Sequence, residues 1–300
     1  MTGAPPQGGR DDLHPPRLAV RQAVAIALAE DVLPLGDITA SLLPVGAAGR
    51  AAFVARRPGV VAGTACVVEV CALVDPALEC TVELDDGAEV SAGGVVARVE
   101  GPFRSLLVAE RTALNFLCHL SGVATLTRRY VELARAANPS TRVWDTRKTT
   151  PGLRALEKAA VRAGGAVNHR GSLSEGVLVK DNHLGGVSIE DAVARALARW
   201  PGRMVEVECD RLDQVAVAVA AGATLVLCDN MSPEDVARAV AIVRAHPRGA
   251  AGAVLVEASG GVDLTTVAGF AAAGADVVSV GAITHSAPVL DIGLDLEIDG

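Results

Sequence analysis

The sequence predicts an α/β protein whose second half forms a barrel of parallel strands, and two observations carry this prediction. From Arg142 onward, short apolar runs alternate with alanine-rich segments long enough to form helices. Strands that are apolar on both faces are typical of a parallel sheet covered by helices. Polar residues also follow the apolar runs one after another. A barrel collects such groups from the ends of nearly all its strands, whereas an open sheet concentrates them at one switch point.

Six apolar runs are expected to be the strands of this sheet. They are residues 142–145, 177–180, 204–209, 224–229, 254–259 and 276–281. The alternation alone would also allow an open, doubly wound sheet, so the barrel depends on the polar residues at the strand ends. Because the usual barrel has eight strands, we expect an incomplete, six-stranded type. Two of the expected helices, Ser188–Arg199 and Pro233–Ala245, open at a serine and continue with acidic residues, which satisfy free amide groups at a helix start.

The first half has a different pattern, with short strands and glycine-rich turns among helices. The expected helices are Leu18–Glu30, Cys66–Val74 and Ser105–Ala137, and the expected strands are Ala51–Ala55, Val60–Ala62, Leu78–Leu84 and Val95–Glu100. This pattern predicts a separate α+β domain over 18–125, followed by a barrel domain over 126–287. Residues 1–17 are rich in proline, glycine and charge and are expected to be a disordered extension. The tail 288–300 is expected to return to the first domain.

Composition excludes several classes of function. Half of the residues are hydrophobic and the formal net charge is −8, which argues against general nucleic-acid binding, since that needs a basic surface. The six cysteines form no CxxC pair, so neither a zinc site nor a redox motif is predicted. We interpret them as buried apolar side chains of a protein in the reducing cytoplasm. Because no apolar stretch reaches the length of a membrane span, no membrane partner is expected.

A basic island lies in this acidic chain, between Arg142 and Lys180. The segment contains eight Lys or Arg residues against three Asp or Glu, and such a local excess is typical of a site for an anion. Arg154, Lys158 and Arg162 recur at helical spacing, and we interpret them as a solvated helix face. Other cations stand at turns and strand ends among small residues and are interpreted as an anion pocket; these are Arg147, Lys148, Arg170 and Lys180.

Two carboxylates end consecutive expected strands, Glu208 in VEVEC and Asp229 in LVLCD. At a barrel mouth such groups could hold Mg²⁺, hold ribose hydroxyls or act as a base, and a salt bridge to the neighbouring cations is the alternative. Hard oxygen ligands without a His/Cys cluster favour Mg²⁺ over zinc. After the last two strands, the segments EASGGV and SVGAITHS are small enough for backbone amides to approach a ligand. This position often holds phosphate in barrels.

Two further residues have alternative interpretations. His169 precedes Arg170 in a polar loop, where it could serve the site or only pack, and its cationic neighbours would disfavour the imidazolium. Arg111, with Glu110, interrupts an apolar helix face before the barrel. It could form a helix-surface ion pair with Glu110 or contribute to a site.

Taken together, these motifs resemble the quinolinate phosphoribosyltransferase family of NAD biosynthesis. The matching segments, in order from about Leu18 to the end, are GDIT, ERTALNFLCHLSGVAT, DTRKTTPGLRALEKAAVRAGG, NHR, VKDNH, VEVEC, LCDNM, EASGG and VGAITHSAPVLDIGLDL. The resemblance implies an N-terminal α/β sandwich and an incomplete α/β barrel. It also implies a homodimer, or a higher oligomer of dimers, with active sites shared between subunits.

The resemblance further implies an activity, which is transfer of phosphoribose from phosphoribosyl pyrophosphate to quinolinate with Mg²⁺. The implied products are nicotinate mononucleotide, pyrophosphate and CO₂. A phosphoribosyltransferase acting on another ring is one alternative, and a non-catalytic anion-binding protein on the same fold is another.

The family motifs imply a role for each matching residue. The implied neighbours of the two quinolinate carboxylates are Arg147, His169, Arg170 and Lys180, with Arg111 from the partner subunit. The remaining implied substrate-binding residues, for the donor and its metal, are Lys148, Thr149, Glu208, Asp229, Ser259, Gly260, Gly261 and Gly281. Among them, Lys148, Glu208 and Asp229 are the implied catalytic residues, and the two carboxylates are the implied metal ligands.

Overall fold

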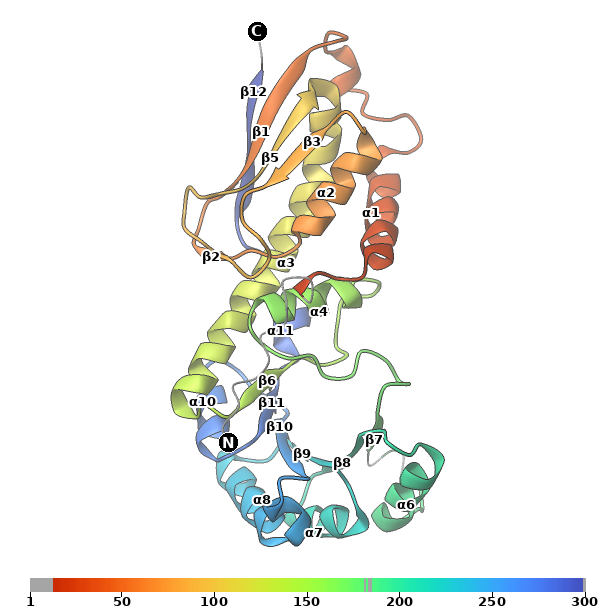
Figure 1. The fold of residues 1–300 in the computed structure, drawn as a ribbon, viewed down its shortest axis with the longest axis vertical. Coiled ribbons are helices and arrows are strands. Elements are labelled where there is room, and N and C mark those ends of the chain that lie inside the picture. Colours follow the sequence, from red (N-terminus) through yellow and green to blue (C-terminus); the bar gives the residue numbers. More distant parts are fainter. Residues whose placement is uncertain (1–12, 181, 183–184, 299–300) are drawn as a thin grey trace. The chain divides into compact units, whose positions relative to one another are not determined.

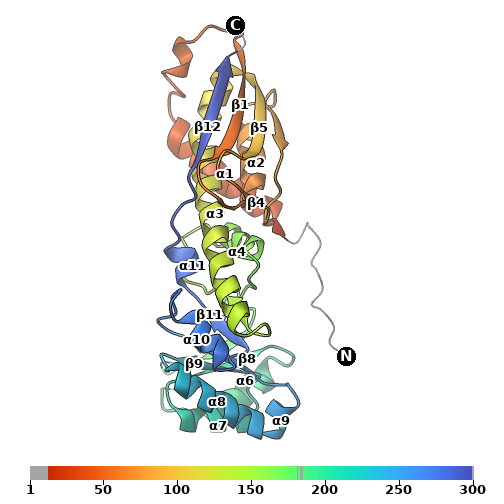
Figure 2. The same ribbon diagram turned by 90° about the vertical axis from the view of Figure 1, so that its left-hand side faces the viewer.

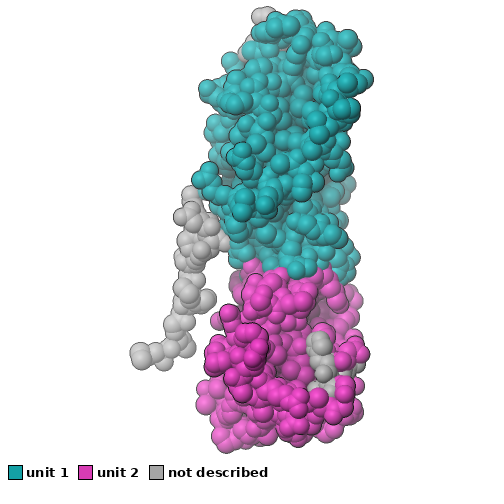
Figure 3. Space-filling view, turned by 90° about the vertical axis from the view of Figure 1, so that its right-hand side faces the viewer, with its two compact units in different colours: residues 1–128, 149–165, 283–300 teal, residues 129–148, 166–282 magenta. Residues whose placement is uncertain are grey.

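The structure is a computed structural model that describes residues 13–180, 182 and 185–298. The chain divides into two compact units, which Figure 3 shows in different colours. Unit 1 consists of residues 1–128, 149–165 and 283–300, and unit 2 of residues 129–148 and 166–282. Most of the expected disordered extension lies outside the described residues, since only residues 13–17 of it are described.

Unit 1 contains a four-stranded antiparallel sheet with helices on one side (Figure 1). The strand order is β12-β1-β5-β3, and the bounds are β1 Ala48–Ala55, β3 Glu79–Val82, β5 Val95–Pro102 and β12 Ile292–Ile298. Helices α1 (Arg17–Val32) and α2 (Thr64–Val74) pack against each other. Strand β12 comes from the tail of the chain and pairs antiparallel with β1, which places Phe53 opposite Leu294.

Helix α3 (Phe103–Ala137) is the long helix that the sequence predicts after the first strands. Its residues 103–128 belong to unit 1 and its residues 129–137 to unit 2. In unit 1, α2 begins at a glycine that lies close to α3. Gly63 has φ +96°, and a Cβ on it would lie 2.8 Å from Leu120 Cδ1, so only glycine fits this start.

Unit 2 is built on a six-stranded parallel sheet with the order β6-β11-β10-β9-β8-β7. The bounds are β6 Arg142–Trp144, β7 Val177–Val179, β8 Val205–Cys209, β9 Leu225–Asp229, β10 Leu255–Ser259 and β11 Val277–Ser279. All six strands were predicted from the apolar runs. The sheet ends at β6 and β7, and among the described residues no ladder joins these two strands. The expected fold class, a small N-terminal sheet domain followed by an incomplete six-stranded α/β barrel, is confirmed.

Helices of unit 2 follow the strands and pack against the sheet, except α9, which follows α8 and packs against it (Figure 2). Their bounds are α6 Ile189–Arg199, α7 Leu212–Ala221, α8 Pro233–Ala245, α9 Pro247–Ala250 and α10 Val267–Ala272. The two predicted serine caps are present. Ser188 Oγ accepts a hydrogen bond from the Asp191 amide at 3.1 Å, and Ser232 Oγ accepts one from the Asp235 amide at 3.2 Å.

The remaining elements are short. They are a 3₁₀ helix at Ala40–Leu42, β2 Gly59–Val60, β4 Glu89–Val90, α4 Arg154–Ala163 and α11 Ala282–His285. Strands β2 and β4 pair antiparallel with each other. Within the described part of the chain, no helix is both long enough and apolar enough to cross a membrane.

The two faces of the unit 2 sheet differ in character, because side chains alternate along each strand. In β8, Val205, Val207 and Cys209 share one buried face. Glu206 and Glu208 therefore share the other face. The register aligns Glu208 and Glu257 with Leu227 of β9, so all three strands contribute to this second face. The acidic residues of β8, β9 and β10 therefore all lie on this second face of the sheet.

Candidate active site

The polar residues predicted to lie at strand ends do lie there. Lys180 follows β7 directly, Glu208 precedes the last residue of β8, and Asp229 and Ser259 end β9 and β10. Arg147 and Gly281 lie in the loops after β6 and β11. Because the strands are parallel, their carboxyl ends share one edge of the sheet. Unit 2 thus collects these groups on a single edge, as the barrel prediction requires.

Lys180 and Glu208 form a direct ion pair across β7 and β8, with Lys180 Nζ donating to Glu208 Oε2. The side chain of Glu208 is 14% exposed and that of Lys180 is 42% exposed. The salt bridge that the sequence left as an alternative for Glu208 is therefore present. Part of each group nevertheless still faces solvent and a ligand could reach it.

The loops after β9 and β10 meet at a contact that requires glycine. Gly260 has φ +92°, and a Cβ there would lie 2.2 Å from Asn230 Oδ1. Asn230 is itself in a left-handed conformation, with φ 54°. Its side-chain amide donates to Asp229 Oδ2 at 2.8 Å and its backbone amide donates to Ser259 O at 2.9 Å. The small residues of EASGG thus let two loops close tightly around Asp229.

Asp145 anchors the loop that contains His169 and Arg170. Its side chain is fully buried. One carboxylate oxygen accepts a hydrogen bond from the His169 amide at 2.8 Å, and the other accepts one from Asn168 Nδ2 at 2.7 Å. Charge-assisted bonds of this kind are stronger than neutral ones. Asp145, the residue after β6, thereby fixes the NHR loop.

His169 is enclosed within unit 2, with its side chain only 8% exposed. The Trp144 ring packs edge-on against it, with centroids 5.3 Å apart and planes at 88°. Its Nδ1 accepts a hydrogen bond from the Arg170 amide at 2.7 Å. Its Nε2 lies 3.1 Å from Glu206 Oε2 and 3.6 Å from Glu257 Oε2.

Glu206 and Glu257 are the functional candidates that sequence reasoning missed. Both side chains are almost completely buried, and Ser279 Oγ donates to Glu257 Oε1. Each lies inside an apolar run that was interpreted only as a strand. A signal was available, because the two-residue period of a strand puts Glu206 on the same face as Glu208.

Arg170 is held in place with its charge partly desolvated. Its Nη1 donates to Gly176 O at 3.0 Å. Burial lowers the pKa of Arg170; the negative charge of Glu206 opposes this shift and the positive charge of Arg147 adds to it. Since the ordinary pKa of arginine lies above 12, the guanidinium stays charged. Two neighbouring cations that repel each other are suited to receive an anion.

Arg111 and Thr149 belong to unit 1. Arg111 lies on α3 with its side chain 64% exposed, and Glu110 Oε1 lies 4.0 Å from it. It lines a cavity of about 590 Å³ with Asn115, His119 and Thr150. Thr149 Oγ1 accepts a hydrogen bond from Arg154 Nε at 3.0 Å.

The interpretation of α4 as a solvated basic face is wrong. Lys158 is buried, with only 7% of its surface exposed. Arg162 is half-buried and donates from Nη1 to Lys158 O at 3.3 Å and from Nη2 to His14 O at 3.2 Å. The helical spacing correctly predicted that Arg154, Lys158 and Arg162 share one face of α4. That face packs against other parts of the chain and does not face water.

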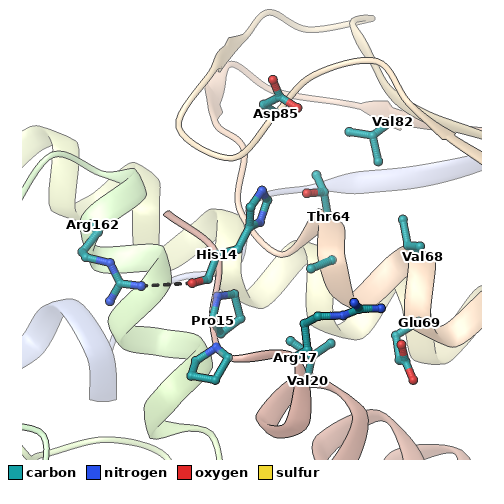
Figure 4. Close-up of a pocket in the computed structure, with 12 residues that line it drawn as sticks. His14, Pro15, Arg17, Val20, Thr64, Val68, Glu69, Val82, Asp85 and Arg162 are labelled. Carbon is teal, nitrogen blue, oxygen red and sulfur yellow. Dashed lines mark hydrogen bonds between the residues drawn. The ribbon is translucent and has the colours of Figure 1, made fainter. Parts of the chain in front are cut away.

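A cavity of about 1100 Å³ lies in unit 1 and contains none of the predicted site residues (Figure 4). Apolar residues such as Val68 and Val82 line it together with groups of both charges, including Arg17 and Glu69. Figure 4 shows Arg162 bonded to the His14 carbonyl at one side. This mixed lining does not match a pocket for a dianion.

Comparison with known proteins identifies the family. A model described as the quinolinate phosphoribosyl transferase C-terminal domain matches residues 123–295, and the corresponding N-terminal domain model matches residues 37–121. A nicotinate-nucleotide pyrophosphorylase (carboxylating) from Mycobacterium leprae is 42% identical over 286 residues, which cover 93% of this chain and 97% of that protein.

Solved structures agree with this relationship. The nicotinate-nucleotide pyrophosphorylase from Francisella tularensis has a TM-score of 0.88 at 37% identity and covers 96% of this chain and 99% of that one. The enzyme of the same name from Ehrlichia chaffeensis has a TM-score of 0.85 at 34% identity and covers 92% of this chain and 98% of that one. The resemblance inferred from the motifs is confirmed, and the chain belongs to the quinolinate phosphoribosyl transferase family.

Proposed function

We propose that this protein transfers phosphoribose from phosphoribosyl pyrophosphate to quinolinate and releases CO₂, forming nicotinate mononucleotide and pyrophosphate. The observation that carries the proposal is the carboxyl edge of the unit 2 sheet. Cations (Arg147, Lys180) and carboxylates (Glu208, Asp229) follow the strands at this one edge. Both substrates are strongly anionic, and the donor also needs a divalent cation, so an edge with both kinds of group fits them.

The cations of this edge are proposed to bind quinolinate. Arg147 and Arg170 offer planar guanidinium groups that can pair with a carboxylate through two hydrogen bonds. Lys180, which follows β7, offers a point charge. His169 belongs to the same loop as Arg170. Two carboxylates on neighbouring ring carbons need several cations at once, whereas nicotinate, with one carboxylate, needs fewer.

The phosphoribosyl donor is proposed to be bound by the other residues that the family motifs imply. These are Lys148, Thr149, Glu208, Asp229, Ser259, Gly260, Gly261 and Gly281. Space around Gly261 is open, since a Cβ there would meet no atom within 4 Å, and a backbone without a side chain can approach phosphate oxygens closely. Lys148 is exposed at the turn after β6 and would add a charge.

Glu208 and Asp229 are proposed to hold Mg²⁺, directly or through water. They fit this ion because both are hard oxygen donors on the same face of adjacent strands, near the sheet edge. When bound, Mg²⁺ would neutralise the charge of the departing pyrophosphate. The two carboxylates would also stabilise positive charge that develops on the ribose carbon as the ring nitrogen attacks it. After transfer, loss of the 2-carboxylate leaves negative charge on the ring, which the cations of the pocket would steady.

The active site is proposed to be shared between two copies of this chain. Arg111 supports this, because its side chain is 64% exposed and has no close carboxylate partner among the described residues, Glu110 being 4.0 Å away. We propose that the Arg111 side chain reaches the quinolinate carboxylates bound by the partner. The protein would then be a homodimer or a higher oligomer of dimers. The reaction is proposed to occur in the cytoplasm, since the six cysteines are free thiols.

Turnover of defined substrates tests the reaction. Purified protein with quinolinate, phosphoribosyl pyrophosphate and Mg²⁺ should form nicotinate mononucleotide with one CO₂ for each nucleotide. Removal of the metal with a chelator should stop turnover, and added Mg²⁺ should restore it. Faster turnover of nicotinate than of quinolinate would contradict the carboxylating reaction.

Complementation between subunits tests the shared site. Arg111→Ala and Lys148→Ala homodimers should each be nearly inactive. In a mixed dimer, one site would draw both intact residues from different chains and the other would carry both defects, so activity should approach half that of the wild type. Failure of a verified mixed dimer to recover activity would show that Arg111 serves its own subunit.

A further inference from the structure

Two buried acids on the same face of the unit 2 sheet as Glu208 have no part in the proposed chemistry. We call these two residues, Glu206 and Glu257, the floor acids. Glu206 on β8 is 0% exposed and Glu257 on β10 is 1% exposed. Among the described residues, neither oxygen of Glu206 has a hydrogen-bond partner, and the same holds for Glu257 Oε2. A buried carboxylate without a donor is unfavourable. Such an arrangement needs a compensating role.

The ring of His169 lies close to the oxygens of these acids that have no hydrogen bond. Its Nε2 faces both, at 3.1 Å from Glu206 Oε2 and 3.6 Å from Glu257 Oε2. Its other nitrogen, Nδ1, accepts the Arg170 backbone amide at 2.7 Å and therefore carries no proton. A neutral ring has one proton, so that proton lies on Nε2. This nitrogen is within ion-pair distance of both carboxylates, although neither contact has the geometry of a hydrogen bond.

A metal ion is the alternative occupant, because ligand atoms of His169, Glu206 and Glu257 lie within 4.8 Å of one another. Metal binding would need the lone pair on Nε2. The proton would then move to Nδ1, where it would face the Arg170 amide proton across a distance of 2.7 Å between nitrogens. Two donors at that distance repel each other. The contact with Arg170 thus favours a proton on Nε2 over a metal.

We propose that Glu206 and Glu257 are positioning residues, which orient the His169 ring through its Nε2 proton so that Nδ1 fixes the main chain at Arg170. The inference rests on the proposed function, since Arg170 is assigned there to quinolinate. The ring would thereby link Glu206 and Glu257 on the sheet to the loop that contains Arg170. The Trp144 ring packs edge-on against the His169 ring, and Asp145 accepts a hydrogen bond from the His169 amide.

The proposal changes the role of His169. A histidine whose Nδ1 and Nε2 both face groups of its own unit is a support for the pocket more than a ligand of the substrate. Glu206 also places negative charge near Arg170, which Arg147 repels. Glu206 opposes the lowering of the Arg170 pKa that burial causes. The pocket would thus be arranged before quinolinate arrives.

Nitrogen-15 NMR of the histidine rings tests the arrangement directly. The chain has six histidines, and the His169 signals can be assigned by their loss in His169→Gln. The wild type should show a protonated Nε2 and an unprotonated Nδ1 for this ring. In Glu206→Gln the pattern should shift toward a mixture of tautomers. Glu157→Gln, which alters the other buried histidine–glutamate pair, should change the His119 signals and leave those of His169 unchanged.

Steady-state kinetics distinguish a positioning role of Glu206 from a general disturbance of the structure. Glu206→Gln should raise KM for quinolinate by about tenfold or more, the size typical of residues that orient a binding side chain. KM for phosphoribosyl pyrophosphate should stay the same, although Glu208 lies two residues away on the same strand. Should Glu206→Gln fail to fold, Glu257→Gln provides the same two measurements.

Several results would overturn the proposal. A protonated Nδ1 in the wild type, or an unchanged KM for quinolinate in both glutamine variants, would show that the acids do not position His169. A bound metal that is stoichiometric in the wild type and lost in Glu206→Gln would make the cluster a metal site. Absence of quinolinate turnover in the wild type would instead refute the proposed function, and the NMR result would still decide the orientation of the ring.

Discussion

Each unit contains a buried glutamate beside a histidine, and the two pairs differ in how the carboxylate is satisfied. In unit 1, Glu157 Oε1 lies 2.9 Å from His119 Nε2, and Glu157 Oε2 accepts the Thr150 amide at 3.1 Å. In unit 2, Glu206 approaches His169 at 3.1 Å, but neither of its oxygens has a hydrogen bond from a described residue. Both glutamates are 0% exposed.

The difference indicates different roles for similar residues. The unit 1 pair is complete, because both oxygens of Glu157 have partners, and it ties α4 to α3 and to the loop at Thr150. The unit 2 pair is incomplete and has a second buried acid beside it. Unfavourable groups persist in folded proteins mainly where function needs them. The first pair is therefore expected to contribute to stability and the second to activity.

The largest expected effect concerns Arg147 and Arg170, the cations that are proposed to bind quinolinate. Arg147→Ala or Arg170→Ala should weaken quinolinate binding by about 2–4 kcal/mol, the order seen when a buried charge loses its partner. Calorimetric titration of the folded variants measures this. Arg142→Ala is the matched control, since Arg142 is exposed at the other end of β6. Equal dissociation constants for the wild type and all three variants would place these arginines outside the pocket and break the comparison.

The sequence carried most of the fold because its signals were local. The six strands of unit 2 stand out as apolar runs, and Ser188 and Ser232 mark helix starts through contacts three residues away. The placement of polar residues at strand ends also followed from local order. Pairing between distant segments has no such signal, as the contact of Phe53 with Leu294 illustrates.

The site was less predictable where burial reverses the usual behaviour of a residue type. Lys158 was interpreted as solvated because lysine usually is, yet the packing of α4 encloses it. Glu206 and Glu257 were interpreted as parts of strands because their neighbours are apolar. Only the register of β8, β9 and β10 places the two acids on one face. The proton on His169 Nε2 depends on a hydrogen bond between side chain and backbone, which no pattern in the sequence encodes.

Replacing Glu157 or Glu206 by glutamine sharpens the comparison between the two histidine–glutamate pairs. Glu157→Gln should lower the free energy of unfolding by about 1–3 kcal/mol, because an amide cannot accept from both His119 and Thr150. Glu206→Gln should leave it unchanged or raise it, since it replaces a buried carboxylate that lacks a donor. Denaturant unfolding of both variants measures the difference. A larger loss of stability for Glu206→Gln than for Glu157→Gln would show that the unit 2 pair is the structural one.

The smallest expected effect is a dependence of stability on pH through Glu257. Burial raises the pKa of Glu257 well above its ordinary value of 4.5, and the charge of Glu206 raises it further; the bond from Ser279 and the charge of Lys180 oppose the shift. A raised pKa means that the folded state holds a proton which the unfolded chain releases. The contribution of Glu257 is therefore complete below its ordinary pKa of 4.5 and is lost as pH rises toward the folded pKa.

Over that window the unfolding free energy should fall with rising pH by at most about 1.4 kcal/mol per pH unit for one proton. Glu257→Gln has no proton to lose, so its stability should fall less steeply than that of the wild type, and the two curves should diverge as pH rises. Denaturant unfolding from about pH 5 to about pH 8 measures both slopes. Glu157→Gln serves as the control, because its substitution leaves Glu257 in place and should retain the slope of the wild type. Parallel curves for the wild type and Glu257→Gln would mean that Glu257 releases no proton across this range, and that its pKa is not raised by burial.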